Sequence, residues 1–246
     1  MSLLNLRHPV EVAPGVYQLP AIGARVTAVA GADGLLLVDS GTRGSLRMMD
    51  GGLNEIGYSL ADVRLIVLTH THPDHAGGLA ALVRATSAPV AVHQAEADFV
   101  SGAEPMPSPY RFGLLARVTG PIMHRLYGPP VRVDYPLADG ATLEWSDEVR
   151  VVHIPGHTAG SISLYLPAQR VVIIGDALQY RFRRLSGPAW SVTKDPAQAV
   201  ESLERLIPLD FGTIVFSHFS PLVDDARGAV ERLISQRHNR AAMDRR

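Results

Sequence analysis

The sequence contains no cysteine among its 246 residues. That absence excludes a disulfide framework, a cysteine-ligated zinc finger, an iron–sulfur cluster and a cysteine nucleophile. Any metal ion that the protein binds must therefore be held by histidine and carboxylate side chains. Because ten histidines are present, their positions decide whether such a site exists.

Charge and long apolar runs are also scarce. Charged residues make up 19% of the chain, the formal net charge is −1 and Lys194 is the single lysine, so we expect no binding to nucleic acid or to anionic lipid. The longest apolar runs, GLLLV and RVVIIG, have the length of strands and are too short to span a bilayer. Since the N-terminal segment also lacks the pattern of a signal peptide, we expect a cytoplasmic protein with a small-molecule substrate. The oligomeric state stays open, and a dimer is possible.

The chain is built from apolar runs of strand length, separated by turn residues and helical patterns. Each half reads as strands followed by a helix, which predicts two sheets packed together with helices outside, in one domain that covers 1–246. The expected strands are 16–19, 25–30, 35–38, 65–68, 89–93, 142–145, 149–154, 161–166, 171–175 and 213–217. The expected helices are 43–57, 76–86, 196–207 and 225–236, with another opening at Glu96 and a frayed tail at 240–246.

Residues 101–135 differ from the rest because prolines bracket an apolar segment that carries arginines. One interpretation is a helical insertion packed on the body of the protein. The other is a wall or lid over a site, since long insertions are often functional. The apolar side chains that would suit a partly hydrophobic substrate are Met106, Phe112, Leu114, Leu115, Ile122 and Leu126.

Histidine or aspartate follows five of the apolar runs. His70, Asp176 and His218 end three of them, His157 comes shortly after a fourth, and Asp39 ends the run GLLLV. The C-terminal ends of neighbouring strands share one edge of a sheet, where α/β proteins build their sites. Four potential metal ligands in such positions indicate one common site.

The densest group of potential ligands is the segment THTHPDHAGG, which gives His-x-His-x-Asp-His. In an extended segment, residues two apart point the same way, so His70 and His72 can hold one ion. Pro73 ends the strand, and Asp74 and His75 then face another direction from the start of the following helix. This geometry predicts two adjacent metal ions.

Each of these two ions needs further ligands, and His157, Asp176 and His218 are available. Because a carboxylate has two oxygen atoms, Asp176 suits a position that both ions share. A structural role for the whole window would instead leave buried polar groups unpaired, at about 1–3 kcal/mol each. The remaining histidines are interpreted as structural or surface residues: His8, His93, His124, His153 and His238. Of these, His93 and His124 are weak site candidates.

At these residues the sequence resembles the metallo-β-lactamase-fold superfamily of metallohydrolases, in the His/Asp-ligated branch that is glyoxalase II-like and lactonase-like. Five segments match in the family's order: VDSGT at 38–42, THTHPDHAGG at 69–78, PGHTAGSISLY at 155–165, GDAL at 175–178 and SHFSPL at 217–222. The resemblance implies an α+β fold, an αββα four-layer sandwich in which two mixed β-sheets pack face to face with helices outside. The 101–135 segment would be a lid-like insertion in it.

The resemblance also implies how the ligands divide between the two ions. The first ion would be bound by His70, His72 and His157, the second by Asp74, His75 and His218, with Asp176 bridging both. Asp39 would support the ligands from behind, as metal-bound imidazoles commonly need. The family often has Gly-His-Gly at the last ligand, and the Phe219 found here departs from that pattern and would narrow the pocket.

Two zinc ions are the expected cofactors, because imidazole and carboxylate suit zinc; iron and manganese are alternatives. A hydroxide that bridges two metal ions would attack a small ester, thioester or lactone, and the ions would stabilise the charge formed in the transition state. Asp74 is the expected catalytic residue, since its carboxylate can orient the hydroxide or carry a proton to the leaving group.

Substrate contacts are expected shortly after Asp176. Tyr180 and Arg181 could hold an anionic or carbonyl-bearing substrate, although a solvated loop is the alternative interpretation, and Phe219 would lie beside them. The chain continues only from 219 to 246 after the last ligand, so we expect no C-terminal glutathione-binding domain of the glyoxalase II type.

Two other activities stay open at this point. A mononuclear non-haem iron oxidoreductase of the sulfur dioxygenase type would use the same fold but only four ligands, which are His70, His72, His157 and Asp176. A phosphodiesterase is the other alternative, although a single lysine offers no groove that tracks phosphates. Metal analysis and oxygen uptake would discriminate the first from a hydrolase.

Overall fold

The computed structural model describes residues 7–111, 113–144 and 148–243. Phe112, and Trp145 at the end of a predicted strand, lie outside the described residues. The side chains of Leu114, Leu115 and Ile122 do so as well, so the expectation that they face a substrate stays a prediction. Among the described residues, no helix combines the length and the hydrophobicity that crossing a bilayer requires.

Within the described residues, the first half of the chain forms a seven-stranded mixed sheet whose strands lie in sequence order. Neighbours pair antiparallel from β1 to β4 and parallel from β4 to β7. Its strands are β1 Val10–Ala13, β2 Val16–Leu19, β3 Val26–Gly31, β4 Gly34–Val38, β5 Val63–Val67, β6 Val90–His93 and β7 Tyr135–Leu137.

The second half forms a five-stranded sheet in the described residues, in the order β14-β11-β10-β9-β8. Only β11 and β14 pair parallel. Its strands are β8 Thr142–Glu144, β9 Glu148–His153, β10 Ile162–Leu166, β11 Val171–Ile173 and β14 Thr213–Val215. A separate hairpin consists of β12 Gln179–Arg181 and β13 Arg184–Ser186.

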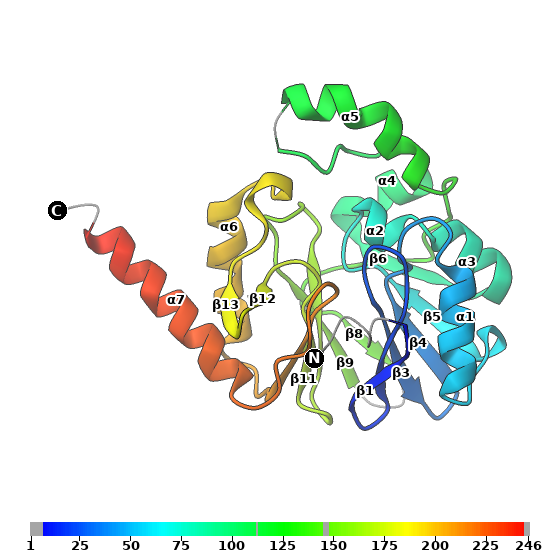
Figure 1. The fold of residues 1–246 in the computed structure, drawn as a ribbon, viewed down its shortest axis with the longest axis horizontal. Coiled ribbons are helices and arrows are strands. Elements are labelled where there is room, and N and C mark those ends of the chain that lie inside the picture. Colours follow the sequence, from blue (N-terminus) through cyan, green and yellow to red (C-terminus); the bar gives the residue numbers. More distant parts are fainter. Residues whose placement is uncertain (1–6, 112, 145–147, 244–246) are drawn as a thin grey trace.

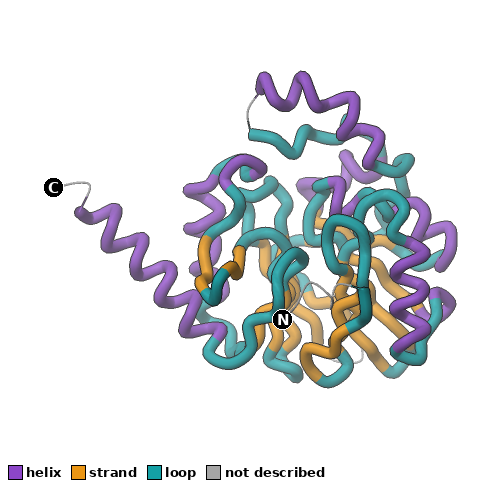
Figure 2. Tube along the Cα trace, viewed as in Figure 1, coloured by secondary structure: helices purple, strands orange, loops and turns teal. Residues whose placement is uncertain are grey.

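Helices lie on the outer side of each sheet, as Figures 1 and 2 show. The α-helices are α1 Leu46–Glu55, α2 Pro73–Ala76, α3 Leu79–Thr86, α4 Ala97–Ser101, α5 Gly113–Leu126, α6 Pro196–Glu201 and α7 Ala226–Met243. Short 3-10 turns are Leu60–Asp62, Gln94–Glu96, Trp190–Val192 and Ser202–Leu206. α1 and α3 cover the first sheet, and α6 and α7 flank the second.

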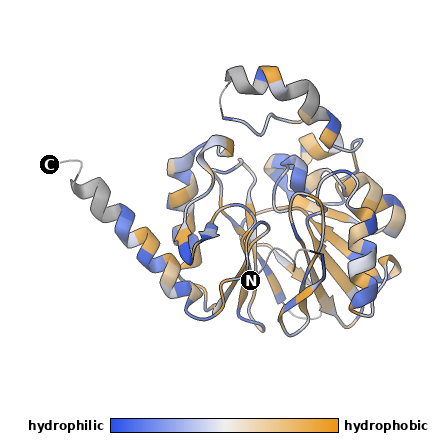
Figure 3. Ribbon diagram, in the orientation of Figure 1, coloured by the Kyte–Doolittle hydropathy of each residue, from blue (hydrophilic) through white to orange (hydrophobic). Residues whose placement is uncertain are grey.

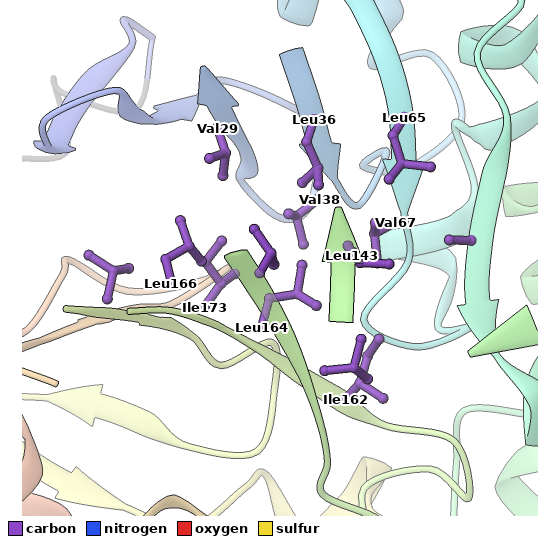
Figure 4. Packing of buried hydrophobic residues seen from close by; sticks show 14 of the residues in the cluster. Val29, Leu36, Val38, Leu65, Val67, Leu143, Ile162, Leu164, Leu166 and Ile173 are labelled. Atoms are coloured by element: carbon purple, nitrogen blue, oxygen red, sulfur yellow. The ribbon is translucent and has the colours of Figure 1, made fainter. Parts of the chain in front are cut away.

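The central strands, such as β4 and β10, are continuous apolar runs, and both of their faces are buried. In β4, Leu36 and Val38 point into the core between the sheets, while Leu35 and Leu37 pack toward α1 and α3. Figure 4 shows the side chains of the inner core, with those of β4 and β5 meeting those of β10 and β11. A third cluster packs α7 and the Ser202–Leu206 turn against the other face of the second sheet. In Figure 3 the hydrophobic colouring accordingly lies on the strands.

The predicted four-layer α+β sandwich is confirmed by this arrangement. Three short features were not expected: β1, β7 and the β12–β13 hairpin, which occupies the segment interpreted as a possible solvated loop. The helix expected to end at 236 continues to Met243, so a frayed tail is wrong for 240–243. At α6, Asp195 accepts hydrogen bonds from the backbone of Ala197 and Gln198, the expected N-cap.

The insertion lies across one end of the sandwich, where α5 forms the top of the molecule in Figure 1. It is tied to the second half of the chain by Arg111, whose backbone N–H donates to the carbonyl of Ser191 at 3.1 Å. The guanidinium of Arg111 also lies 5.2 Å from the centre of the Trp190 ring. The insertion, which belongs to the middle of the chain, is therefore also in contact with the second half of the fold.

Candidate metal centre

The seven residues expected as metal ligands lie together at one edge of the paired sheets. Four come from the segment between β5 and α3, and the others follow β9, β11 and β14. Three groups bring their ligand atoms within 4.8 Å of one another. The groups are His70, His72 and His157; His70, His75 and Asp176; and Asp74, His75 and His218.

We call His70, His72 and His157 the first group of ligands and Asp74, His75 and His218 the second group. Asp176 lies between these two groups. Its Oδ1 lies 3.4 Å from Nε2 of His75 and 3.2 Å from Nε2 of His218. Its Oδ2 lies 3.8 Å from Nε2 of His157, which in turn lies 3.0 Å from Nδ1 of His72. One carboxylate thus presents one oxygen to each group.

Two threonine hydroxyls fix the tautomers of the first group. Thr193 Oγ1 donates to the carbonyl of Ala189 at 2.8 Å, so it can only accept from Nδ1–H of His157 at 3.0 Å. Thr69 Oγ1 lies 2.9 and 3.0 Å from the carboxylate oxygens of Asp39 and 3.0 Å from Nδ1 of His70. Because the hydroxyl proton goes to the carboxylate, both imidazoles carry the Nε2 lone pair that a metal ion needs.

The second group is held in the same way by other acceptors. Asp39, which is buried, accepts from Nδ1–H of His75 at 2.7 Å. Nδ1 of His218 donates to the carbonyl of Gly23 at 3.1 Å. Nε2 of each imidazole consequently faces Asp74 and Asp176, so these ligands are oriented before any ion binds.

Burial makes the first group neutral. It lowers the pKa of His70 and of His72 well below 6.5, with the neighbouring imidazoles acting in the same direction. Burial also lowers the pKa of His157 to about 4. At neutral pH the three side chains are therefore uncharged donors of lone pairs, as a cation requires.

In the second group, neighbouring carboxylates decide the pKa of the imidazoles. Burial disfavours a charge on His75, but neighbouring carboxylates, Asp39 above all, hold its pKa well above 6.5. Burial acts likewise on His218, and hydrogen bonds to Asp176 and Asp74 outweigh it and raise the pKa to about 9. Burial would raise the pKa of both carboxyls, but the adjacent imidazoles hold it well below the usual range. A bound cation would take the place of the imidazole protons here.

The donor set fits metal ions. Nε2 of His70 and Nε2 of His75 are buried and have no hydrogen-bond partner among the described residues, although both face other ligand atoms. Leaving such groups unpaired costs about 1–3 kcal/mol each, and a cation removes that cost. Imidazole nitrogen and carboxylate oxygen are the ligands that zinc prefers when cysteine is absent.

A cavity of about 210 Å³ opens at these ligands and is walled by the insertion. His72, Asp74 and Asp176 line it, and Asp74 has 33% of its side chain exposed there. The insertion contributes four further lining residues, which are Pro109, Tyr110, Met123 and Leu126. The segment 101–135 therefore contributes side chains to the lining of this cavity, and its role as a lid stays a prediction.

Of the three expected substrate residues, Phe219 lies beside His218, with ring centres 6.3 Å apart. Tyr180 stacks on Phe216, with ring centres 5.9 Å apart. It packs against the third hydrophobic cluster, on the outer face of the second sheet. The guanidinium of Arg181 lies 5.2 Å from the ring centre of Phe219. None of the three is among the described residues that line the 210 Å³ cavity, so their role in substrate binding stays a prediction.

Sequence reasoning found Asp39 but missed Thr69, Thr193 and the carbonyl of Gly23. Thr69 directly precedes His70, and a hydroxyl in that position was a usable signal. Thr193 is separated from His157 by 36 residues, and only the folded chain brings them together. Gly23 has a φ of +88°, and an added Cβ would lie 2.8 Å from Cβ of Asp74, so this close approach needs glycine.

Comparison with known proteins finds relatives that are named as hydrolases. A probable metallo-hydrolase, YflN, of Bacillus subtilis (strain 168) is 27% identical over 232 residues, which cover 86% of each chain. A hydroxyacylglutathione hydrolase of Jannaschia sp. (strain CCS1) is 32% identical over 183 residues, 74% of this chain and 57% of that relative. The chain thus matches little more than half of the latter's length.

Solved structures share the fold. A metallo-beta-lactamase family protein from Thermus thermophilus has a TM-score of 0.71 at 27% identity, covering 94% of this chain and 81% of that one. A beta-lactamase from Chitinophaga pinensis has a TM-score of 0.69 at 20% identity, covering 94% and 91%. The sequence profile of the metallo-beta-lactamase superfamily matches residues 21–218, and the chain belongs to that superfamily.

Proposed function

We propose that this protein is a hydrolase that uses two metal ions, zinc in the first place, to cleave a small thioester, ester or lactone. The position of Asp176 carries the proposal, because its two oxygens face two separate groups of ligands. A relative named as a hydroxyacylglutathione hydrolase supports a thioester among these substrates.

Metal ions in these positions would supply Lewis acidity that polarises a carbonyl and acidifies water. The chain's own residues then have distinct tasks. Asp74 is ionised and partly exposed in the cavity, so its carboxylate can accept a proton from water and pass it to the leaving group. Asp39, Thr69 and Thr193 hold the imidazoles in place, while Tyr110 and Leu126 of the insertion exclude water from the substrate.

The test combines elemental analysis with an assay panel of thioesters, esters, lactones and phosphodiesters. We expect about two zinc ions per chain and hydrolysis of at least one acyl substrate. The substitution His72→Ala should abolish turnover and lower the metal content, because it removes one of the three imidazoles of the first group. About one iron per chain, with oxygen uptake and no hydrolysis, would overturn the proposal, as would an unchanged metal content in the His72→Ala variant.

A further inference from the structure

The loop that carries His157 spans residues 154–161, between β9 and β10. We call it the His157 loop. Its two ends are joined by a hydrogen bond from the backbone N–H of Ile154 to the carbonyl of Ser161 at 2.8 Å. On the side of the second half of the chain, the carbonyls of Gly156 and His157 accept from backbone N–H groups that directly precede α6. The position of the His157 imidazole depends on what holds this loop on its other side.

The His157 loop borders a cavity of about 270 Å³, to which it contributes Gly156, Thr158 and Ala159. Glu96 and Phe99, which follow β6 in the first half of the chain, line the same cavity. Because side chains do not fill this space, packing alone does not hold the loop against the first half here. A directed bond between the two halves is needed to fix their separation.

Glu96 makes such a bond. It belongs to the 3-10 turn Gln94–Glu96 and is 1% exposed, and its Oε1 accepts from the backbone N–H of Gly160 at 3.1 Å. An added Cβ at Gly160 would clash with Cγ of Glu96, so glycine lets the backbone of the loop lie directly on this side chain. The hydrogen bond thus ties the first half of the chain to the loop close to His157.

The same turn supports the loop at a second point. His93 directly precedes the turn and stacks on His153, with ring centres 3.9 Å apart and ring planes at 14°. Nε2 of His153 donates to the carbonyl of Ala159 at 2.9 Å. The first half therefore holds the His157 loop through Gly160 directly and through His153 indirectly.

Packing alone does not account for a carboxyl group at position 96. Oε2 of Glu96 is buried as well, and it has no hydrogen-bond partner among the described residues. Burying an unpaired polar atom is costly, and an apolar side chain of the same length would avoid that cost. What the carboxyl group adds is the acceptor for the N–H of Gly160, and residues that lower stability in this way are expected where function needs them.

We propose that Glu96 is a positioning residue of the metal centre, which holds the His157 loop at Gly160 so that the imidazole of His157 stays beside those of His70 and His72. The inference rests on the proposed function, since it takes these three imidazoles to bind a metal ion. Their ligand atoms lie within 4.8 Å of one another, and Nε2 of His157 lies 3.0 Å from Nδ1 of His72. A shift of the loop by about 1 Å toward the cavity would separate His157 from the other two and weaken the binding of a shared ion.

Two substitutions of similar length separate the acceptor from the packing. Glu96→Met keeps an unbranched side chain but has no oxygen, whereas Glu96→Gln keeps an oxygen that accepts from Gly160. In the metal-free protein, we expect the amide hydrogen of Gly160 to exchange about tenfold faster or more in the Glu96→Met variant and at an unchanged rate in the Glu96→Gln variant.

Zinc affinity, measured by competition with a chelator, is the second readout. It should fall by about 10- to 100-fold in the Glu96→Met variant and be restored in the Glu96→Gln variant. A parallel series that also carries His218→Ala, which removes a ligand of the second group, assigns the loss to the first group. A loss that disappears in this series would contradict the proposal.

Leu53→Ala is the control for a general loss of stability. Leu53 is buried in α1, a helix that carries none of the seven expected ligands. The substitution should lower the unfolding temperature, because it leaves a cavity in the core, but it should leave the zinc affinity as it is. An equal loss of zinc affinity in this control would overturn the positioning role.

The remaining outcomes distinguish this inference from the proposed function. Equal zinc affinities in the Glu96→Met and Glu96→Gln variants overturn the positioning role, and so does an unchanged exchange rate of the Gly160 amide in the Glu96→Met variant. If that variant does not fold, Glu96→Asp decides, since its carboxyl is drawn back by one methylene: it should also lose zinc affinity, and an unchanged affinity would overturn the inference. Zinc binding by the unaltered protein without hydrolysis of any acyl substrate overturns the proposed function alone.

Discussion

Single hydroxyl groups decide which nitrogen of an imidazole faces the metal centre. Thr193 lies between the carbonyl of Ala189 and Nδ1 of His157, and its one proton is committed to the carbonyl. Thr69 does the same for His70 by donating to Asp39. These hydrogen bonds determine which nitrogen of each imidazole is free to bind a metal ion.

Thr193→Val should therefore weaken metal binding without unfolding the protein. The valine has nearly the same shape but no acceptor for Nδ1–H of His157, so the imidazole loses its fixed tautomer. We expect the affinity for the first ion to fall by about 10- to 100-fold, measured by competition with a chelator. Thr193→Ser keeps the hydroxyl and should bind metal nearly as the unaltered protein does. Equal affinities in the valine variant would show that the hydrogen bond does not orient this ligand.

How much of the site the sequence predicts differs from residue to residue. The spacing of His70, His72, Asp74 and His75 is local, so their division into two directions follows from strand and helix geometry alone. Thr193 and the carbonyl of Gly23 reach their histidines only through tertiary packing, and no local pattern marks them.

At the scale of elements, the loop that carries His157 is fixed to the start of α6. The carbonyls of Gly156 and His157 accept from the backbone N–H groups of Asp195 and Lys194 at 2.9 and 3.1 Å. Gly156 has a φ of +125°, and a Cβ there would meet the backbone of Ala199 in α6. The glycine therefore permits a contact that no other residue allows.

Gly156→Ala should consequently destabilise the fold by about 2–4 kcal/mol, the combined cost of a strained backbone and a clash. Denaturant unfolding measures this change. Gly51→Ala is the control, since Gly51 lies within α1 and a Cβ there meets nothing within 4 Å. The control should gain up to about 1 kcal/mol from helix propensity. A loss of less than about 0.5 kcal/mol in the Gly156→Ala variant would contradict the proposed clash.

The elements themselves were predicted well where both faces of a strand are buried, as in β4 and β10, because such runs are continuous and apolar. The missed elements are short and half-exposed, such as β7 with its exposed Tyr135. The β12–β13 hairpin turns at Phe182 and Arg183, which both have positive φ. Turn signals rest on glycine and asparagine, so a turn made by these two residues gives no signal.

At the scale of the whole molecule, both ligand groups take side chains from both halves of the chain. His70 and His72 of the first half meet His157 of the second, and Asp74 and His75 meet His218. Bound ions would therefore join the two sheets at their edge, and their binding energy would add to the stability of the folded state.

Removing the metal should lower the thermal stability of the whole fold. At a free metal concentration of about a thousand times the dissociation constant, binding adds about 4 kcal/mol, which corresponds to a shift of roughly 10 °C in Tm for a domain of this size. Calorimetry before and after chelation measures the shift. Two equivalents of zinc should restore it, and full recovery with one equivalent would argue against a second ion. An unchanged Tm after complete metal removal would show that the centre does not join the halves.

The segment 107–110 of the insertion contributes to the walls of two cavities, of about 270 and 210 Å³. Pro107 and Ser108 line the cavity of about 270 Å³, whereas Pro109 and Tyr110 line the cavity of about 210 Å³ at the metal ligands. A substitution in this segment would therefore change the wall of at least one of the two cavities. None of the seven expected metal ligands lies in this segment, so such a substitution would reshape the space beside the ligands while the sandwich that supplies them stays the same.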